Sequence, residues 1–279
     1  MQLGVTIFAT DRSMSPVEVA REAEARGFHS LYVPEHTHIP VSRRTPPPTG
    51  EAVLPEEYLR TLDPFVSLAA AASVTRQLRL GTGIALVAQH DPIVLAKTLA
   101  TLDYLSAGRL VVGIGYGWNQ DEMESHGVDP RRRRAITREK MLAMQALWAK
   151  EVAEFDGEFV RFAPSWQWPK PVQKPRPPVL IGGAAGPILF AQIAEYADGW
   201  IPIGGAGLQR TLPELRRACE ARGRDPGTLQ IVPMGVLPDP AKLEFYASLG
   251  VTEAVLRLPS APRDEVMPVL DGYARFVGS

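Results

Sequence analysis

The stretch Arg109-Leu-Val-Val-Gly-Ile-Gly-Tyr-Gly-Trp-Asn119 indicates how the chain folds. Its consecutive apolar residues, with β-branched valines, are typical of a strand covered on both faces, as in a parallel sheet. Gly113, Gly115 and Gly117 are spaced two apart, so one face of the strand loses its side chains near the C-terminal end. This spacing is not the G-x-G-x-x-G of a dinucleotide-binding turn. It predicts room for a flat ligand, or alternatively a close packing contact or a bulge.

A second stretch repeats the pattern. Leu78-Arg-Leu-Gly-Thr-Gly-Ile-Ala-Leu-Val87 also reads as a strand whose end carries two glycines on one face, Gly81 and Gly83. Two bare strand ends together favour the ligand over the packing contact. We interpret them as a floor for a planar cofactor.

Composition excludes several classes of protein. The 279 residues carry a formal net charge of -1, which gives no electrostatic attraction to nucleic acid or to an acidic membrane surface. The single cysteine, Cys219, excludes an internal disulfide framework. We find no secretory signal and no apolar run near the ~20 residues of a membrane span. The expectation is a cytoplasmic protein without nucleic-acid or membrane partners.

The pattern of strands and helices predicts the architecture. Ser15-Pro16, Asp63-Pro64, Asp91-Pro92 and Asp239-Pro240 are helix starts, and Thr211 with Glu214 forms a capping box. Strands alternating with such helices favour an α/β (β/α)8 TIM barrel, one domain over 1–279 with insertions at the C-terminal face. An open doubly wound sheet is the alternative. The eight expected strands are 3–8, 30–33, 78–87, 109–119, 178–181, 199–203, 229–234 and 253–258, with irregular excursions at 39–62 and 151–177.

Barrel enzymes carry their active site where the strands end, which directs attention to two further features. Gly182-Gly-Ala-Ala-Gly186 opens into a helix and offers backbone N–H groups to a phosphate, although a tight turn without a ligand is also compatible. His36 follows the second strand beside Glu35 and is the best candidate acid or base. His36-x-His38 could begin a metal site, but all five histidines lie in the first half of the chain, so we expect no metal.

Several segments in order resemble the luciferase-like monooxygenase superfamily, and within it the F420-dependent oxidoreductases of actinobacteria. The resemblance covers the whole chain and implies a (β/α)8 barrel that binds a flavin or the deazaflavin coenzyme F420. It is carried by Ser30-Leu-Tyr-Val-Pro-Glu-His36, Leu80-Gly-Thr-Gly83, Asp91-Pro92, Arg109-Leu-Val-Val-Gly-Ile-Gly-Tyr-Gly-Trp118, Pro178-Val-Leu-Ile-Gly-Gly183 and Ala197-Asp-Gly-Trp200.

The resemblance also implies roles for individual residues. Glu35 and His36 match an acidic–histidine pair at the reactive face of the ring, and Gly83-Ile84 matches a non-prolyl cis peptide or bulge behind it. No match is found to the basic residues that bind a sugar phosphate. The implied catalytic residues are His36 and Glu35, with Glu35 orienting His36 or contacting the cofactor. The implied cofactor-binding residues are Gly83, Ile84, Gly115, Gly117, Trp118, Asn119, Gly182, Gly183, Ala184, Ala185 and Gly186.

The leading hypothesis is an oxidoreductase that moves hydride between F420 and a small organic substrate. The alternatives are an FMN-dependent monooxygenase and a non-catalytic deazaflavin-binding protein. We expect the two excursions, with Trp166 and Trp168, to form the substrate walls. Relatives are often dimers, so we also expect a homodimer.

Overall fold

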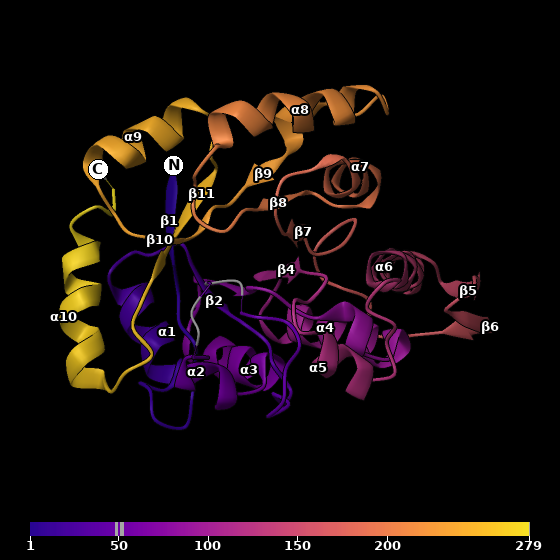
Figure 1. Cartoon of the computed structure of the whole chain (residues 1–279), viewed down its shortest axis with the longest axis horizontal. Helices are drawn as coiled ribbons and strands as arrows, with labels where there is room; N and C mark the ends of the chain where they lie inside the picture. The colour runs from indigo at the N-terminus through magenta and orange to yellow at the C-terminus, as the bar shows by residue number, and fades with distance from the viewer. Residues whose placement is uncertain (48–49, 51–52, 279) are drawn as a thin grey trace.

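The computed structural model describes residues 1–47, 50 and 53–278. Its main feature is a curled sheet of nine strands with helices around the outside (Figure 1), in the order β10-β11-β1-β2-β3-β4-β7-β8-β9. Neighbouring strands in this sheet are parallel, so their C-terminal ends lie along one edge. The strands are β1 (Gln2–Thr6), β2 (Ser30–Val33), β3 (Arg79–Thr82), β4 (Leu110–Ile114), β7 (Val179–Gly182), β8 (Gly199–Ile201), β9 (Gln230–Ile231), β10 (Met234–Val236) and β11 (Glu253–Arg257).

The expected seventh strand is divided into β9 and β10. Between them lie Val232 and Pro233, and proline has no N–H to donate to a neighbouring strand. The two pieces continue one path, since Val232 N–H donates to Trp200 O at 2.9 Å and Met234 N–H donates to Pro202 O at 2.9 Å. β9 pairs with β8 and β10 pairs with β11, so the two ends of the sheet order are consecutive in the chain. The expected third strand is also shorter, because it ends at Thr82.

Most helix starts agree with the sequence. Ser15, Asp63, Asp91 and Asp239 cap their helices as predicted, each accepting a backbone N–H of the first turn. The prediction of a Thr211–Glu214 capping box is wrong, because α8 begins earlier in the chain, directly after Gly207. The helices are α1 (Pro16–Ala25), α2 (Glu56–Leu59), α3 (Pro64–Val74), α4 (Pro92–Leu105), α5 (Gln120–Ser125), α6 (Arg133–Ala149), α7 (Pro187–Tyr196), α8 (Leu208–Glu220), α9 (Pro240–Ser248) and α10 (Arg263–Ala274), with the 3₁₀ turns η1 (Val87–Gln89) and η2 (Pro226–Thr228).

The two excursions differ from each other. The first, 39–62, contains α2, while 48–49 and 51–52 lie outside the described residues. The second was expected to be irregular, and this is wrong. It contains an antiparallel hairpin of β5 (Val152–Asp156) and β6 (Arg161–Trp166), which lies beyond α6, away from the curled sheet (Figure 1). The hairpin is mostly exposed, and the apolar alternation that reveals a strand in a sequence is short, with Ala153 and Phe155 as its inward residues in β5.

Apolar side chains fill both sides of the curled sheet. A small cluster lies inside the curl, one residue from each contributing segment, and a large cluster lies between the sheet and the helices. The inner cluster comprises Tyr32, Val111, Leu180, Ile201, Val232 and Val255, with Ile84 and Met234 packed against it. This inner cluster therefore packs beneath the C-terminal edge of the sheet.

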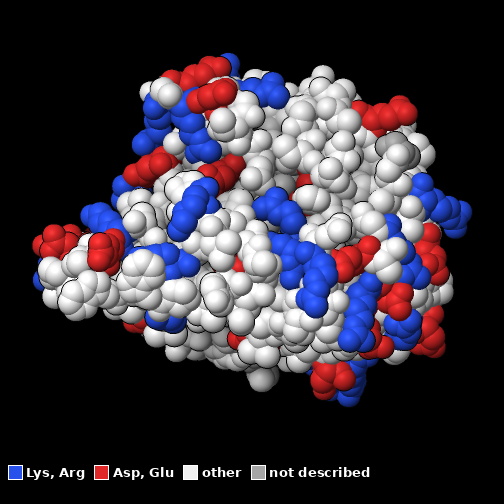
Figure 2. Space-filling model, turned by 180° about the vertical axis from the view of Figure 1, so that it is seen from behind, with Lys and Arg blue, Asp and Glu red and all other residues white. Residues whose placement is uncertain are grey.

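The surface carries both signs of charge. Acidic and basic side chains are interspersed around the edge of the face in Figure 2, as expected for a net charge of -1. Within the described part of the chain, no helix combines the length and the apolar character needed to cross a membrane.

Candidate functional site

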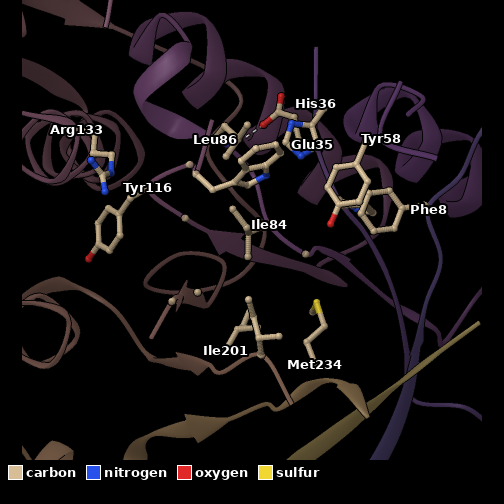
Figure 3. A pocket seen from close by; sticks show the side chains of 18 of the residues that line it. Phe8, Glu35, His36, Tyr58, Ile84, Leu86, Tyr116, Arg133, Ile201 and Met234 are labelled. Atoms are coloured by element: carbon tan, nitrogen blue, oxygen red, sulfur yellow. Dashed lines mark hydrogen bonds between the residues drawn. The ribbon is translucent and has the colours of Figure 1, made fainter. Parts of the chain in front are cut away.

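A cavity of about 280 Å³ opens at the C-terminal edge of the sheet. Its walls come from the segments that follow β1, β2, β3 and β4 and from the ends of β7 and β8, where a barrel-type enzyme is expected to carry its site. Figure 3 shows Ile84 in the middle of this space, with Arg133 and Tyr116 on one side and Phe8 and Tyr58 on the other. The walls are largely apolar and aromatic, with few polar groups, which is typical of a site for a small organic ligand.

Ile84 lies at the centre because nearby glycines leave room for its side chain. The Gly83–Ile84 peptide bond is cis, as the family resemblance implied. A Cβ atom on Gly115 would lie 2.1 Å from Ile84 Cδ1, and one on Gly182 would lie 2.8 Å from Ile84 Cγ2. The surface offered to a ligand here is therefore the Ile84 side chain supported by two glycines.

The glycines deeper in the strands serve the protein itself. Gly81 lies beside Tyr32 in the register of β2 and β3, and a Cβ on Gly81 would be 2.2 Å from the Tyr32 ring. A Cβ on Gly113 would be 2.0 Å from the backbone oxygen of Thr82. The interpretation of every bare glycine as ligand floor is thus wrong for these two, and the close-packing alternative applies to them.

His36 is held by a carboxylate that the sequence analysis did not find. Its Nδ1 lies 2.9 Å from Glu122 Oε2 and 3.2 Å from Oε1, and both side chains are buried. Glu122 belongs to α5, which Asn119 caps. With Glu122 as acceptor, the ring proton is placed on Nδ1, which leaves Nε2 available to a ligand. Such a pair is suited to giving or taking a proton at the cavity wall.

Glu35 has other partners. Its Oε2 accepts the Leu86 backbone N–H at 2.6 Å, and its Oε1 lies 2.6 Å from His90 Nε2. The carboxylate is almost completely buried. Glu35 thereby fastens the segment that follows Ile84 to the end of β2. The expectation that Glu35 orients His36 is wrong, since Glu122 does so.

Aromatic rings form the far wall of the cavity. Tyr58 packs against Phe8 with ring centroids 4.7 Å apart, and His36 lies 5.4 Å from Tyr58 and 5.8 Å from Trp118. Tyr58 is carried by the short helix α2.

Ion pairs attach α2 to the rest of the molecule. Glu56 binds Arg12 at 2.6 Å, and Glu57 binds Arg257 at the end of β11 at 2.7 Å. Arg60, which ends the helix, binds Asp11 at 2.7 Å. The first excursion therefore does form part of the cavity wall.

The opposite end of the cavity is basic. Arg133 and Arg134 line it at the start of α6, and Arg134 lies over the Tyr116 ring. The Arg133 Nε is buried and has no hydrogen-bond partner among the described residues, although Nη1 donates to Pro130 O at 2.5 Å. Burial raises the pKa of Tyr116 to about 12, and its hydroxyl donates to Gln192 Oε1 at 2.8 Å.

The glycine-rich turn lies near this basic end. Gly182 and Gly183 line the cavity, and Gly186 precedes α7 without a side-chain cap. Uncapped helix N-termini leave backbone N–H groups that suit an anion. Ala184 and Ala185 are exposed.

The structure brings most of the predicted site residues together. His36 and Glu35 line the cavity, as do the predicted cofactor residues Gly83, Ile84, Gly115, Gly117, Trp118, Gly182 and Gly183. Ala184, Ala185 and Gly186 belong to the adjoining turn and not to the lining, and buried Asn119 caps α5. Trp166 and Trp168 are exposed on the hairpin segment and do not line the cavity, so their expected role as substrate walls is wrong. Within the described residues, no group of histidine, cysteine, aspartate and glutamate could hold a metal ion.

Sequence reasoning missed Glu122, Tyr58 and the two arginines. The run Arg131–Arg134 is visible in the sequence, but a basic run of this kind is more often typical of a solvated loop or helix start than of a binding site. Its position shortly after the strand-four glycines was the signal that could have linked it to the site.

Comparison with known proteins places the chain in a family. The model of the luciferase-like monooxygenase family matches residues 9–237, and the chain belongs to this family. An uncharacterized protein of Mycobacterium tuberculosis is 50% identical over 277 residues, 98% of each chain. The F420-dependent glucose-6-phosphate dehydrogenase of Kineococcus radiotolerans is 30% identical over 195 residues, 65% of this chain and 57% of that one. The solved structure of the monooxygenase RslO1 from Streptomyces bottropensis superposes with a TM-score of 0.80 at 23% identity, covering 99% of this chain and 98% of that one. The family thus includes both F420-dependent oxidoreductases and flavin-dependent monooxygenases.

Proposed function

We propose that this protein is an F420-dependent oxidoreductase that transfers hydride between the deazaflavin and a small organic substrate. The observation that carries the proposal is the buried His36–Glu122 pair on the wall of an apolar cavity. Moving hydride to or from a carbon that bears oxygen requires a proton to move at that oxygen, and a fixed imidazole performs this task near neutral pH.

The residues present fit a cofactor that has both a ring and a phosphate. The apolar walls and Ile84 suit a flat ring, while the buried Arg133 Nε, which has no hydrogen-bond partner in the described part of the chain, and the uncapped start of α7 suit a phosphate. We take β9 and β10 as one interrupted strand, so that the sheet is an eight-stranded barrel with the cavity at its mouth. In such a barrel the two ends of the ligand would lie on opposite sides of Ile84.

When bound, the deazaflavin supplies a carbon that accepts or gives hydride and reacts poorly with oxygen. His36 holds or releases a proton at Nε2, while Glu122 fixes the ring by accepting the Nδ1 proton. Glu35 keeps the Ile84 segment in place through the Leu86 N–H. Phe8, Tyr58 and Trp118 line the cavity with His36 and would exclude water from it when a ligand is bound.

An FMN-dependent monooxygenase is the second candidate. The same phosphate-binding groups and apolar walls would accept FMN, and the chain superposes over nearly its full length on the monooxygenase RslO1. This reading assigns His36 to the handling of an oxygenated substrate.

Fluorescence titration of the purified protein with F420 and with FMN tests the proposal. We expect F420 to bind at least ten-fold more tightly than FMN. Tighter binding of FMN than of F420 would favour the monooxygenase hypothesis. Tight F420 binding without oxidation or reduction of any alcohol, ketone or activated alkene would instead indicate a deazaflavin carrier. Failure to bind either cofactor would refute both enzyme hypotheses.

A further inference from the structure

A second chamber of about 190 Å³ adjoins the cavity on the side away from Arg133. The two spaces share Phe8, Tyr58, Gly83, Ile203 and Met234 as lining residues, so they are continuous at the aromatic wall. The remaining lining residues come from β1, from the segment after it, and from β10 and β11. Among the described residues that line this chamber, Arg257 carries the only charge.

Arg257 lies at the C-terminal end of β11 and is about half exposed. Its Nη2 donates to Glu57 Oε1 at 2.7 Å, and the carboxylate of Glu57 is largely buried. A guanidinium has five N–H donors in one plane, so this pairing fixes the group and still leaves donors for a second acceptor.

The two chambers together place Arg133 and Arg134 at one end of a mostly apolar space and Arg257 at the other. Figure 3 shows Ile84 between Arg133 and the wall formed by Phe8 and Tyr58. Under the proposed function, the cofactor's phosphate takes the Arg133 end. The Arg257 end then remains for the other ligand, and His36 stands on the wall between the two ends.

We propose that the second chamber binds the far end of the substrate and that Arg257 binds a carboxylate there. The substrate class is a small monocarboxylate with an apolar body, whose reactive carbon lies in the shared region near His36. This inference rests on the proposed function, because it assigns the Arg133 end to the cofactor. Planar, bidentate recognition of a carboxylate is the interaction for which a fixed guanidinium is best suited.

The competing explanation is that the Arg257–Glu57 pair only attaches α2. Substitution of each partner in turn distinguishes this explanation from ligand binding. If the pair only attached α2, Arg257→Gln and Glu57→Gln would weaken the same contact and would change ligand binding in the same direction. If Arg257 binds a carboxylate, Glu57 competes with the ligand. The two variants must then change carboxylate affinity in opposite directions.

Calorimetric titration with benzoate and benzamide, of the full chain with and without F420, tests the proposal. We expect benzoate to bind roughly five-fold more tightly than benzamide, a difference that decreases with added salt because the arginine is partly exposed. The preference is lost in Arg257→Gln, partly kept in Arg257→Lys, which retains the charge but not the planar donors, and increased in Glu57→Gln. Arg161→Gln removes a more exposed arginine from the hairpin and leaves the preference unchanged.

Equal binding of the two probes, or a preference that survives Arg257→Gln, would overturn the proposal. So would parallel changes in Arg257→Gln and Glu57→Gln. F420 affinity, followed by fluorescence, should stay within two-fold in every variant. Because benzoate preference is measured without F420 as well, a chain that failed to bind F420 would refute the proposed function, while the carboxylate site would stand or fall on the probes alone.

Discussion

Glu35 and His36 are neighbours in the chain, but their side chains belong to two separate acid–histidine pairs. Glu35 binds His90 and His36 binds Glu122. The first pair also accepts the Leu86 N–H and fastens the segment behind Ile84, while the second pair stands on the cavity wall. Adjacent residues thus have different tasks, and substitutions at the two positions should have different consequences.

Replacing His36 by Gln should lower turnover with F420 by about 10²–10⁴-fold, the range expected when a general acid or base is lost. Glu122→Gln should lower turnover less, by about ten-fold, because the imidazole remains but loses its orienting acceptor. Stopped-flow measurement of F420 absorbance gives both rates. F420 affinity should stay within a few fold, and Glu122→Asp should recover part of the loss. Wild-type turnover in His36→Gln would remove His36 from the mechanism.

Glu35→Gln should act mainly on stability. The buried carboxylate offers an acceptor oxygen both to the Leu86 N–H and to His90, whereas an amide has a single acceptor oxygen and turns its NH₂ group towards one of the two partners. We expect the free energy of unfolding in urea to fall by about 1–3 kcal/mol. Glu154→Gln, on the exposed hairpin, is the matched control and should change it little. Equal effects of the two substitutions would contradict the fastening role of Glu35.

Three glycines should respond differently to alanine. Gly113→Ala would place a Cβ 2.0 Å from the backbone oxygen of Thr82, which cannot move away, so little folded protein is expected. Gly115→Ala would meet only the end of the Ile84 side chain, so the protein should fold but bind F420 more weakly. Gly186→Ala meets nothing within 4 Å and should resemble the wild type. Circular dichroism and F420 titration give the two readouts, and the opposite order for Gly113 and Gly115 would be incompatible with this packing.

Arg133→Gln should weaken F420 binding by about ten-fold, or about 1.4 kcal/mol, because it removes a buried donor from the basic end of the cavity. Arg131→Gln, two residues earlier in the same basic run, is the control and should leave F420 affinity unchanged. A deazaflavin lacking the phosphate should bind both variants equally. Equal loss of F420 affinity in both variants would point to a general charge effect.

Glu253 should make stability depend on pH. Burial inside the curl raises the pKa of this carboxyl above its usual value, although Ser30 and Tyr32 donate hydrogen bonds to it. The folded protein therefore retains a proton that the unfolded chain has lost. This contribution is fully present below the usual pKa of 4.5 and is lost as the pH rises through the folded-state pKa.

Glu253→Gln cannot ionise and should escape that loss. Relative to the wild type, its free energy of unfolding in urea should rise with pH by at most ~1.4 kcal/mol per pH unit within the titration range. Glu244→Gln, on the exposed side of α9, should follow the wild type. Parallel wild-type and Glu253→Gln curves between pH 5 and 8 would show that Glu253 does not titrate differently on folding.

Much of the fold could be predicted because local signals repeat along the chain. The cap-then-proline starts and the apolar strands gave the order of strands and helices, and most boundaries fell within a few residues. The hairpin at 152–166 was missed because its residues are mostly exposed and its apolar alternation is short. The expected seventh strand is divided because of Pro233. The proline is visible in the sequence, but the strand that lies beside it in the sheet is not.

The site was only partly predictable for a different reason. Residues directly after the strands, such as His36 and Gly83, are located by a topological rule. Glu122 and Tyr58 reach the cavity from α5 and α2. Their positions depend on how segments that are far apart in the sequence pack against each other. Pairing of Glu35 with His90 instead of His36 depends on the direction in which each side chain leaves the backbone.

The attachment of α2 by surface ion pairs has a consequence for how this protein diversifies. One end of the cavity is made from hydrogen-bonded strand ends, where nearly any change disturbs the sheet. The end that carries Tyr58 belongs to a four-residue helix, attached by Arg12, Asp11 and Arg257. Ion pairs between exposed side chains contribute little to stability, so mutations can exchange the Arg12–Glu56 pair at low cost. Substitutions around α2 can therefore change which substrates bind while the proposed cofactor site stays unchanged.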